Sequence, residues 1–309
     1  MSELILHHYG NSPFSEKIRL ILGFKKLPWR SVQIPAIMPK PDVLALTGGY
    51  RKTPFMQIGA DIYCDSALMA RVIDRLQPEP ALYPTHQPLA VPLAQWADFT
   101  LFWSAVTWAM QPAGAAVMLG SAQPEVLKAF AADRAAFTAG MRRNSLADAT
   151  VQLKAHLAAL DTQLRQGGPY LFGAQAGIAD FSVYHSIWFI RRATPVAGLL
   201  DAYPALLSWA DRLASCGHHT HQDLSSADAV ALAAASGAHA PCAVASGMGF
   251  EAGQAVVVQA ADYGTDPVTG TLVGLDEHEV VVQRHDERAG TVHVHFPRFG
   301  FQIKKEATA

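Results

Sequence analysis

Hydrophobic positions in the first part of the chain change from the period of a strand to that of a helix and back. Residues 4–9 (LILHHY) are apolar and suit a β-strand, and residues 10–13 (GNSP) form a turn. Apolar positions in 18–22 then recur at helical spacing, and residues 29–34 alternate as a second strand. This order predicts a βαβ unit with a right-handed crossover and parallel strands.

Two further strands and a helix complete this first unit. Residues 53–58 and 62–64 flank the turn Gly59-Ala60-Asp61 and predict an antiparallel hairpin, and Asp65 opens a helix that runs through Leu76. A βαβ unit followed by ββα is the order of a thioredoxin-like fold. We expect an α/β thioredoxin-like domain over residues 1–84.

Helical periodicity replaces the strand pattern from Pro88 to about Leu213, so we expect an all-helical bundle domain over residues 88–215. The apolar positions form two stripes, Trp96, Phe99, Trp103 and Val106 in the first and Leu153, Leu157, Leu160 and Leu164 in the second. Stripes of this kind usually lie in a core. Trp103 and Val106 could instead face the cleft between the two domains.

The last third of the chain predicts a small β domain after a linker. Residues 216–246 are rich in Ala, Ser, Gly and His, with one helix at 227–235 capped by Ser225 or Ser226. Five short strands follow within 247–309, in QAVVVQA, TLVGL, EVVVQRH, TVHVHF and FGFQI, and predict a small all-β antiparallel barrel or sheet. Because the linker is long, we expect this domain to have its own core and a limited interface, and its removal to leave the rest intact.

Composition and charge narrow the class of partner. The chain has 309 residues, with 24 Lys and Arg against 26 Asp and Glu, so no overall field draws it to nucleic acid or to an anionic membrane. Three widely spaced cysteines fit neither a disulfide framework nor a CxxC motif, and the N-terminus does not resemble a signal peptide. We therefore expect a cytoplasmic protein with a small-molecule or protein partner.

One uncharged stretch, residues 101–119, has about the length needed to span a bilayer. It contains polar residues and a proline in its middle, Pro112, and no basic flank orients it. A buried core helix is the better interpretation, so we expect no membrane partner.

Ser12 holds the position with the clearest chemistry. It ends the turn of YGNSPFSEKIR, just before a helix N-terminus, where free N–H groups and the helix dipole favour negative charge. A hydroxyl there can donate to a bound thiolate and lower the pKa of the thiol. The alternative is that Ser12 or Ser15 only caps the helix.

Two other motifs suit an extended peptide ligand. In Lys52-Thr53-Pro54-Phe55 a cis proline would turn the Thr53 backbone toward the Ser12 pocket, whereas a trans proline would only start a strand. In Cys64-Asp65-Ser66 the helix start could hold a carboxylate while Asp65 accepts from an ammonium, or Asp65 could serve as a simple cap.

Together these motifs resemble the glutathione transferase superfamily. SPFSEKIR is similar to its serine-type active-site segment, KTPF to its cis-proline turn, and CDSALMARVID to its acidic-Ser helix start. GIADFSVYHSIWFI is similar to its buried capping-box helix, with Gly177 in place of the usual Ser or Thr and Asp180 three residues on. The resemblance covers about residues 1–215 and says nothing of the C-terminal strands.

The resemblance implies a role for particular residues. Ser12 would be the thiolate donor, with Tyr9 its main rival, while Cys-using classes are excluded and Cys64 is better explained as a buried strand residue. The implied glutathione contacts are Phe14, Lys40, Lys52, Thr53, Pro54, Asp65 and Ser66, with Arg51 a weaker candidate. Trp103 and Val106 would line the acceptor-substrate pocket.

The expected function is therefore that of an enzyme that activates glutathione, its co-substrate, as the thiolate and conjugates it to an electrophilic apolar molecule. Two alternatives remain, a non-catalytic binding or scaffold protein that uses the β domain, and a glutathione-dependent isomerase or dehalogenase. The resemblance also implies a homodimer. His285, His293 and His295 lack a recognisable metal-ligand spacing, so we expect solvent-facing histidines and no metal.

Overall fold

The N-terminal domain has the predicted order of strands and helices. The computed structural model describes residues 3–120 and 123–306. Its first elements are β1 (Leu4–His8), α1 (Pro13–Phe24), β2 (Trp29–Gln33), α2 (Pro41–Thr47), β3 (Phe55–Ile58), β4 (Asp61–Cys64) and α3 (Ser66–Leu76). β1 pairs in parallel with β2 and antiparallel with β3, and β3 pairs antiparallel with β4. The thioredoxin-like prediction is confirmed.

The second domain is all-helical, as expected. It comprises α4 (Ala90–Trp96), the π-helical turn η1 (Ala97–Leu101), α5 (Phe102–Ala109), α6 (Pro112–Leu119), α7 (Pro124–Phe137), α8 (Leu146–Gly167), α9 (Ile178–Arg192), the 3-10 helix η2 (Thr194–Ala202) and α10 (Pro204–Ala214). The uncharged stretch 101–119 is not one core helix, because it breaks before Pro112. Across the described residues, no helix has both the length and the apolar character that crossing a membrane requires.

The two predicted apolar stripes differ in burial. All four leucines of the α8 stripe are buried, which confirms that prediction. In the first stripe Phe99 is 41% exposed, and the buried positions are instead Ala97, Leu101 and Ala105. The π-turn η1 adds a residue to the helical repeat here, so positions before and after it do not share the face that a regular helix would give them. Trp96 and Val106 are partly buried and pack against apolar clusters, so the core assignment of this stripe holds only in part and fails for Phe99.

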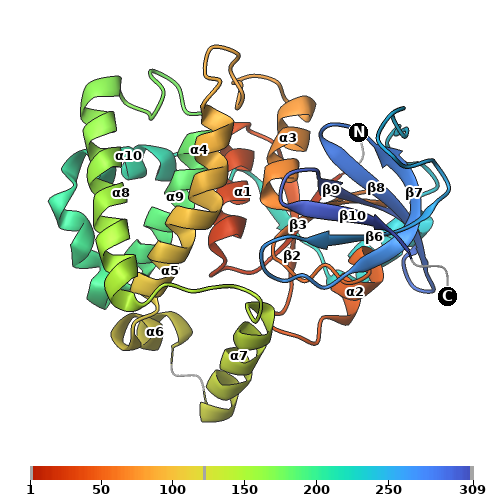
Figure 1. Ribbon diagram of the computed structural model, residues 1–309, viewed down its shortest axis with the longest axis horizontal. Helices are drawn as coiled ribbons and strands as arrows, with labels where there is room; N and C mark the ends of the chain where they lie inside the picture. The colour runs from red at the N-terminus through yellow and green to blue at the C-terminus, as the bar shows by residue number, and fades with distance from the viewer. Residues whose placement is uncertain (1–2, 121–122, 307–309) are drawn as a thin grey trace.

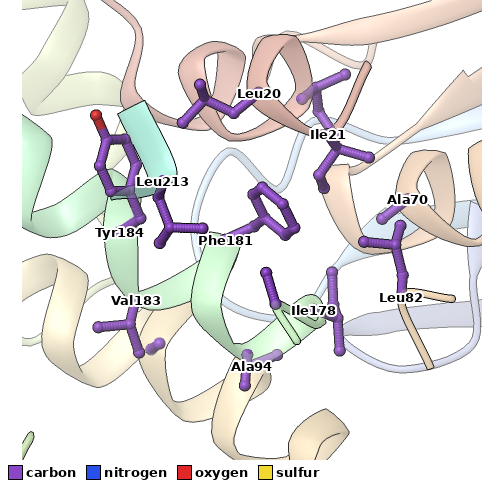
Figure 2. Close-up of a cluster of buried hydrophobic side chains, with 14 of the residues drawn as sticks. Leu20, Ile21, Ala70, Leu82, Ala94, Ile178, Phe181, Val183, Tyr184 and Leu213 are labelled. Carbon is purple, nitrogen blue, oxygen red and sulfur yellow. The ribbon is translucent and has the colours of Figure 1, made fainter. Parts of the chain in front are cut away.

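An apolar core joins the first two domains. Figure 2 shows Leu20 and Ile21 of α1 beside the ring of Phe181 from α9, and all three side chains are fully buried. At the start of α9 the Asp180 carboxylate accepts from the Gly177 N–H at 2.9 Å, as the predicted capping box requires. This packing fixes α1, and hence the turn before it, against the helical domain.

The C-terminal strands do not form a separate module. After β5 (His221–Asp223) and α11 (Ser226–Ala235), the chain forms β6 (Ala255–Ala260), β7 (Val268–Leu275), β8 (Glu279–Asp286), β9 (Gly290–Pro297) and β10 (Phe301–Lys305). The five predicted strands are present, but β9 pairs in parallel with β4. All described strands thus belong to one ten-stranded sheet of order β10-β6-β7-β8-β9-β4-β3-β1-β2-β5.

The expectation of an independent C-terminal core with a limited interface is wrong. Val256, Val282 and Val294 of the late strands share one buried cluster with Phe55 and Ile62 of the N-terminal domain. In Figure 1 the N-terminal domain lies between the helical domain and the C-terminal strands. The linker is also integrated, because β5 extends the sheet beside β2 and α11 packs against β9 and α2. The helix predicted at 227–235 and its Ser225 cap are confirmed.

The histidines of β9 differ from their predicted setting. His293 and His295 are buried rather than solvent-facing, because the ring of His239 stacks on His293 and the ring of Tyr63 packs against His295. Only His285 of the three is exposed.

Candidate active site

Ser12 lies where the sequence predicts, at the N-cap of α1. Its Oγ accepts a hydrogen bond from the Ser15 N–H at 3.2 Å and donates to the Thr53 carbonyl oxygen at 3.4 Å. The capping role is thus real, and it coexists with a contact to the second predicted motif. The dipole and free N–H groups of α1 favour an anion at this point.

Tyr9 shares this location with Ser12. Burial raises the pKa of the Tyr9 phenol, and the charge of Arg134 and the nearby Ser12 side chain act in the opposite direction. The phenol therefore stays protonated near neutral pH and can donate a hydrogen bond. The two rival donors lie side by side, and the geometry by itself ranks neither above the other.

The turn at Thr53 is built as expected. The Thr53–Pro54 peptide bond is cis, and the Thr53 hydroxyl accepts from Lys40 Nζ at 3.3 Å. Burial lowers the pKa of Lys40 to about 8, and the positive charges of Arg134 and Arg51 also lower it. Lys40 is thus a buried cation beside the backbone that is predicted to pair with a peptide ligand.

Asp65 caps α3 from a strained backbone conformation. Its φ is +73°, and its carboxylate accepts from the Ala67 N–H at 2.9 Å. A side chain in this left-handed region costs on the order of 1 kcal/mol, and such residues cluster at functional sites. Burial raises the pKa of Asp65, while the charge of Lys52 and the Ala67 hydrogen bond lower it.

Ser66 belongs to a buried charge network that the sequence did not predict. Its hydroxyl accepts from Lys17 Nζ at 3.2 Å, and Lys17 forms an ion pair with Asp98 at 2.7 Å. Asp98, on the π-turn η1, also contacts His185 Nε2 at 3.1 Å. The network links α1, α3 and two helices of the second domain beneath the predicted site.

Phe14 packs into this interdomain region. Its ring lies 4.7 Å from that of Phe102 and 4.5 Å from that of His185, measured between centroids. It is half-buried, so the structure gives it a packing role in addition to any ligand contact.

The loop between β6 and β7 adds two residues to the site. Asp262 forms an ion pair with Lys52 at 2.6 Å, and Lys52 Nζ lies 4.2 Å from the ring centroid of Tyr263. Burial raises the pKa of Tyr263, as do the charges of Asp262 and Asp65. Lys52, predicted to bind a carboxylate of the ligand, is thus already paired with a carboxylate of the protein.

The same loop is anchored on the helical domain. The Gly264 N–H donates to the Phe137 carbonyl of α7 at 2.9 Å, and the Tyr263 ring contacts Phe137 and Trp103 edge-to-face. Arg51, the weaker carboxylate candidate, is paired with Asp133 of α7 at 2.6 Å. The C-terminal segment and α7 together cover the end of the site that the basic residues form.

The two residues predicted to line the acceptor pocket are in different surroundings. Trp103 lines a cavity of about 190 Å³ together with Phe99, Thr100, Thr107, Met141, Arg142, Arg143, Asn144 and Gln152. Val106 instead packs on a small apolar cluster around Ala109 and Phe189. Through its contact with Tyr263, Trp103 connects this cavity to the loop beside Lys52.

Cys64 is fully buried in β4, and burial raises the pKa of its thiol well above the ordinary value. A thiol of this kind is a poor nucleophile, in keeping with its expected structural place.

Comparison with family models gives two matches. Residues 6–81 match the model described as glutathione S-transferase, N-terminal domain, and residues 142–212 match the one described as glutathione S-transferase, C-terminal domain. No curated protein matches the sequence.

Solved structures extend the comparison. A GST-like protein from Pseudomonas syringae is 44% identical with a TM-score of 0.80, over 99% of this chain and 100% of that one. A Tau class glutathione S-transferase from mango, Mangifera indica, is 18% identical, and FzlA from C. crescentus is 21% identical. Both have a TM-score of 0.51, cover 69% of this chain and 89% of their own, and show the fold alone. The first similarity also spans the C-terminal strands.

Proposed function

This chain belongs to the glutathione S-transferase superfamily, and from that premise we propose that it is an enzyme that binds glutathione, activates it as the thiolate and transfers it to an electrophilic apolar molecule. The observation that carries the proposal is the contact of Ser12 Oγ with the Thr53 carbonyl at 3.4 Å. A thiolate donor and the backbone suited to a peptide ligand lie in one place, at a helix N-terminus.

In the proposed mechanism Ser12 donates its hydroxyl hydrogen to the glutathione sulfur, and the N-terminus of α1 stabilises the negative charge. To do so, the Ser12 hydroxyl must break its hydrogen bond to the Thr53 carbonyl oxygen. That oxygen can then accept a hydrogen bond from the cysteinyl N–H of the ligand. The protonated Tyr9 phenol beside it is the second donor. One donor to a charge in a desolvated site typically contributes on the order of a hundredfold in rate.

The ends of the tripeptide fit the two charged parts of the site. The γ-glutamyl ammonium would pair with Asp65, and its carboxylate would accept from the Ser66 hydroxyl and the first N–H groups of α3. The glycyl carboxylate would lie between Lys40 and Lys52, where it competes with Asp262 for Lys52. Among the described residues Lys40 forms no ion pair, so it is the more available of the two cations.

The acceptor would lie against Trp103 and Tyr263, whose rings separate the Lys52 end of the site from the adjoining cavity. Both side chains present apolar surface, in keeping with an apolar electrophile. We further propose a cytoplasmic homodimer, on the grounds of superfamily membership and of cysteine usage.

One observation favours a second candidate, a glutathione-binding protein without turnover. Asp262 already neutralises the charge of Lys52, and the ring of Tyr263 covers the Lys52 ammonium. The protein's own side chains therefore take the place that a ligand carboxylate would fill. Such a protein would bind glutathione weakly and conjugate no electrophile.

Calorimetry and a turnover assay test the proposal together. Wild-type protein should bind glutathione at millimolar concentration or below and conjugate a chlorodinitrobenzene. Ser12→Ala should retain binding and reduce turnover about a hundredfold, whereas Ser15→Ala, at a neighbouring buried serine, should keep both. Absence of binding to the wild type would refute the proposal, and binding without turnover would favour the second candidate.

A further inference from the structure

A cluster of imidazoles surrounds one carboxylate at the junction of β4 and β9. Asp61 opens β4, and the parallel pairing of the two strands sets it opposite His293, with Tyr63 opposite His295. His239 comes from a third segment, the connection between α11 and β6. This cluster lies at the opposite end of β4 from Asp65, outside the proposed glutathione site.

The donor atoms of three of these residues converge. One ligand atom each from Asp61, His239 and His293 lies within 4.8 Å of the other two. Asp61 Oδ1 is 3.6 Å from His239 Nδ1 and 3.9 Å from His293 Nδ1. Both distances exceed those of a hydrogen bond, so the carboxylate does not satisfy either nitrogen.

Unpaired buried atoms gather here. Within residues 3–120 and 123–306, the Nδ1 atoms of His239 and His293 are buried and make no hydrogen bond. Nδ1 of His295 makes none either, but it lies 3.7 Å from Glu279 Oε2. Buried polar atoms are nearly always paired, and each exception calls for an explanation such as an ion. His293 is 7% exposed, so solvent does not easily supply the partner that its Nδ1 lacks.

Neighbouring groups contact two of the three ligands, Asp61 and His293. The Ala240 N–H donates to Asp61 Oδ2 at 2.8 Å, and His295 Nε2 lies 3.0 Å from Asp61 Oδ1. The amide nitrogen of Gln283 is 3.3 Å from His293 Nε2, and His293 Nδ1 faces Asp61. Metal binding at Nδ1 needs the amide rotated by 180°, so that its oxygen accepts from Nε2–H and holds the ring proton there, as outer partners of metal-bound histidines do.

We propose that Asp61, His239 and His293 bind a divalent transition-metal ion, with Zn²⁺ the ion that best suits two imidazoles and one carboxylate. Zinc bonds of about 2.1 Å place tetrahedral ligands roughly 3.4 Å apart. The donors now lie within 4.8 Å of one another, so they must close by at most about 1.4 Å. The two histidine rings now stack at 3.7 Å, and a rotation of His239 would bring its Nδ1 to the ion. Its side chain is 18% exposed and lies outside helices and strands, which leaves room for this movement.

The ion would tie together three parts of the chain that are far apart in sequence. Its ligands come from the N-terminal domain, from the α11–β6 connection and from the C-terminal strands. A metal that binds only the folded protein stabilises it by mass action. The site would therefore lock the C-terminal strands onto β4, without taking part in the reaction at Ser12.

Metal titration of the full-length protein after chelator treatment tests the proposal. Zn²⁺ should bind by calorimetry with one equivalent, Co²⁺ should give a visible ligand-field spectrum, and Zn²⁺ should raise the melting temperature. His239→Gln and His293→Gln should weaken Zn²⁺ binding at least about tenfold and abolish the thermal shift. His285→Gln is the matched control, since His285 lies on the adjacent strand β8 but is exposed, and among the described residues its side chain hydrogen-bonds only to Thr291.

Three results would refute the metal site. The proposal fails if wild-type protein binds no Zn²⁺ at tens of micromolar, or if His239→Gln binds it as tightly as wild type. It also fails if His285→Gln weakens binding as much as the ligand variants do. Because His239 is partly exposed in an irregular segment, its variant should keep the native circular dichroism spectrum even if His293→Gln does not fold.

Discussion

Replacing Asp262 by Asn should strengthen glutathione binding, because it removes a carboxylate that competes with the ligand for Lys52. The two charged groups are 2.6 Å apart. The Asp262 side chain is 30% exposed and that of Lys52 is 10% exposed, so the ion pair is intermediate between a surface pair and a buried one. A pair in this range contributes about 1–2 kcal/mol. The dissociation constant should therefore fall roughly 5- to 30-fold, as converted by the affinity relation.

Isothermal titration of both proteins with glutathione at low salt measures this change, and added salt should shrink the difference. Asp266→Asn is the matched control, since it removes the same charge from the same loop, but Asp266 lies 4.0 Å from Arg51 and is 44% exposed. Unchanged or weaker binding by Asp262→Asn would refute the competition. Equal strengthening by both variants would show a general effect of charge instead.

Three other changes have defined outcomes. Ser12→Ala should cut turnover by about a hundredfold and Tyr9→Phe by less, and the reverse ranking in a steady-state assay would make Tyr9 the donor. Deleting residues 247–309 should leave the protein insoluble or unfolded by circular dichroism, because it uncovers β4 and the shared core; a soluble fragment that binds glutathione would contradict the continuous sheet. Burial lowers the pKa of His7 to about 4, so between about pH 6.5 and 4 only the unfolded chain takes up this proton, and the free energy of unfolding should fall by up to about 3 kcal/mol. His7→Gln should flatten that pH dependence in denaturant titrations, and identical slopes would refute the assignment.

Local chemistry explains which parts of the site the sequence could predict. The Ser12 cap, the Thr53–Pro54 turn and the Asp65 cap each depend on residues within a few positions of one another. Capping and turn preferences act over that range, so a single sequence reveals them. Their roles toward glutathione stay predictions.

Contacts between distant segments escaped prediction. Asp262 reaches Lys52 across 210 positions, and no local pattern marks either residue as a partner of the other. The pairing of β9 with β4 likewise depends on which edge of the sheet is free once the first domain has folded. The alternation of apolar and polar residues predicts the late strands and the buried face of each. It does not predict which strand pairs with which.

The buried clusters show the same limit. Lys17 and His185 meet Asp98 from separate helices, and Asp61 meets His239 and His293 from separate segments. Metal and charge clusters with short, regular spacing are visible in sequence, whereas those assembled by the fold are not.

The acidity of the bound glutathione thiol tests the central claim most directly. It can be followed by the ultraviolet absorption of the thiolate as pH is varied in the complex. The account predicts that wild-type protein and Ser15→Ala lower the pKa of the thiol below that of free glutathione, and that Ser12→Ala restores it toward the free value. A thiol pKa in the wild-type complex equal to that of free glutathione, or one that Ser12→Ala leaves lowered, would contradict thiolate activation at Ser12.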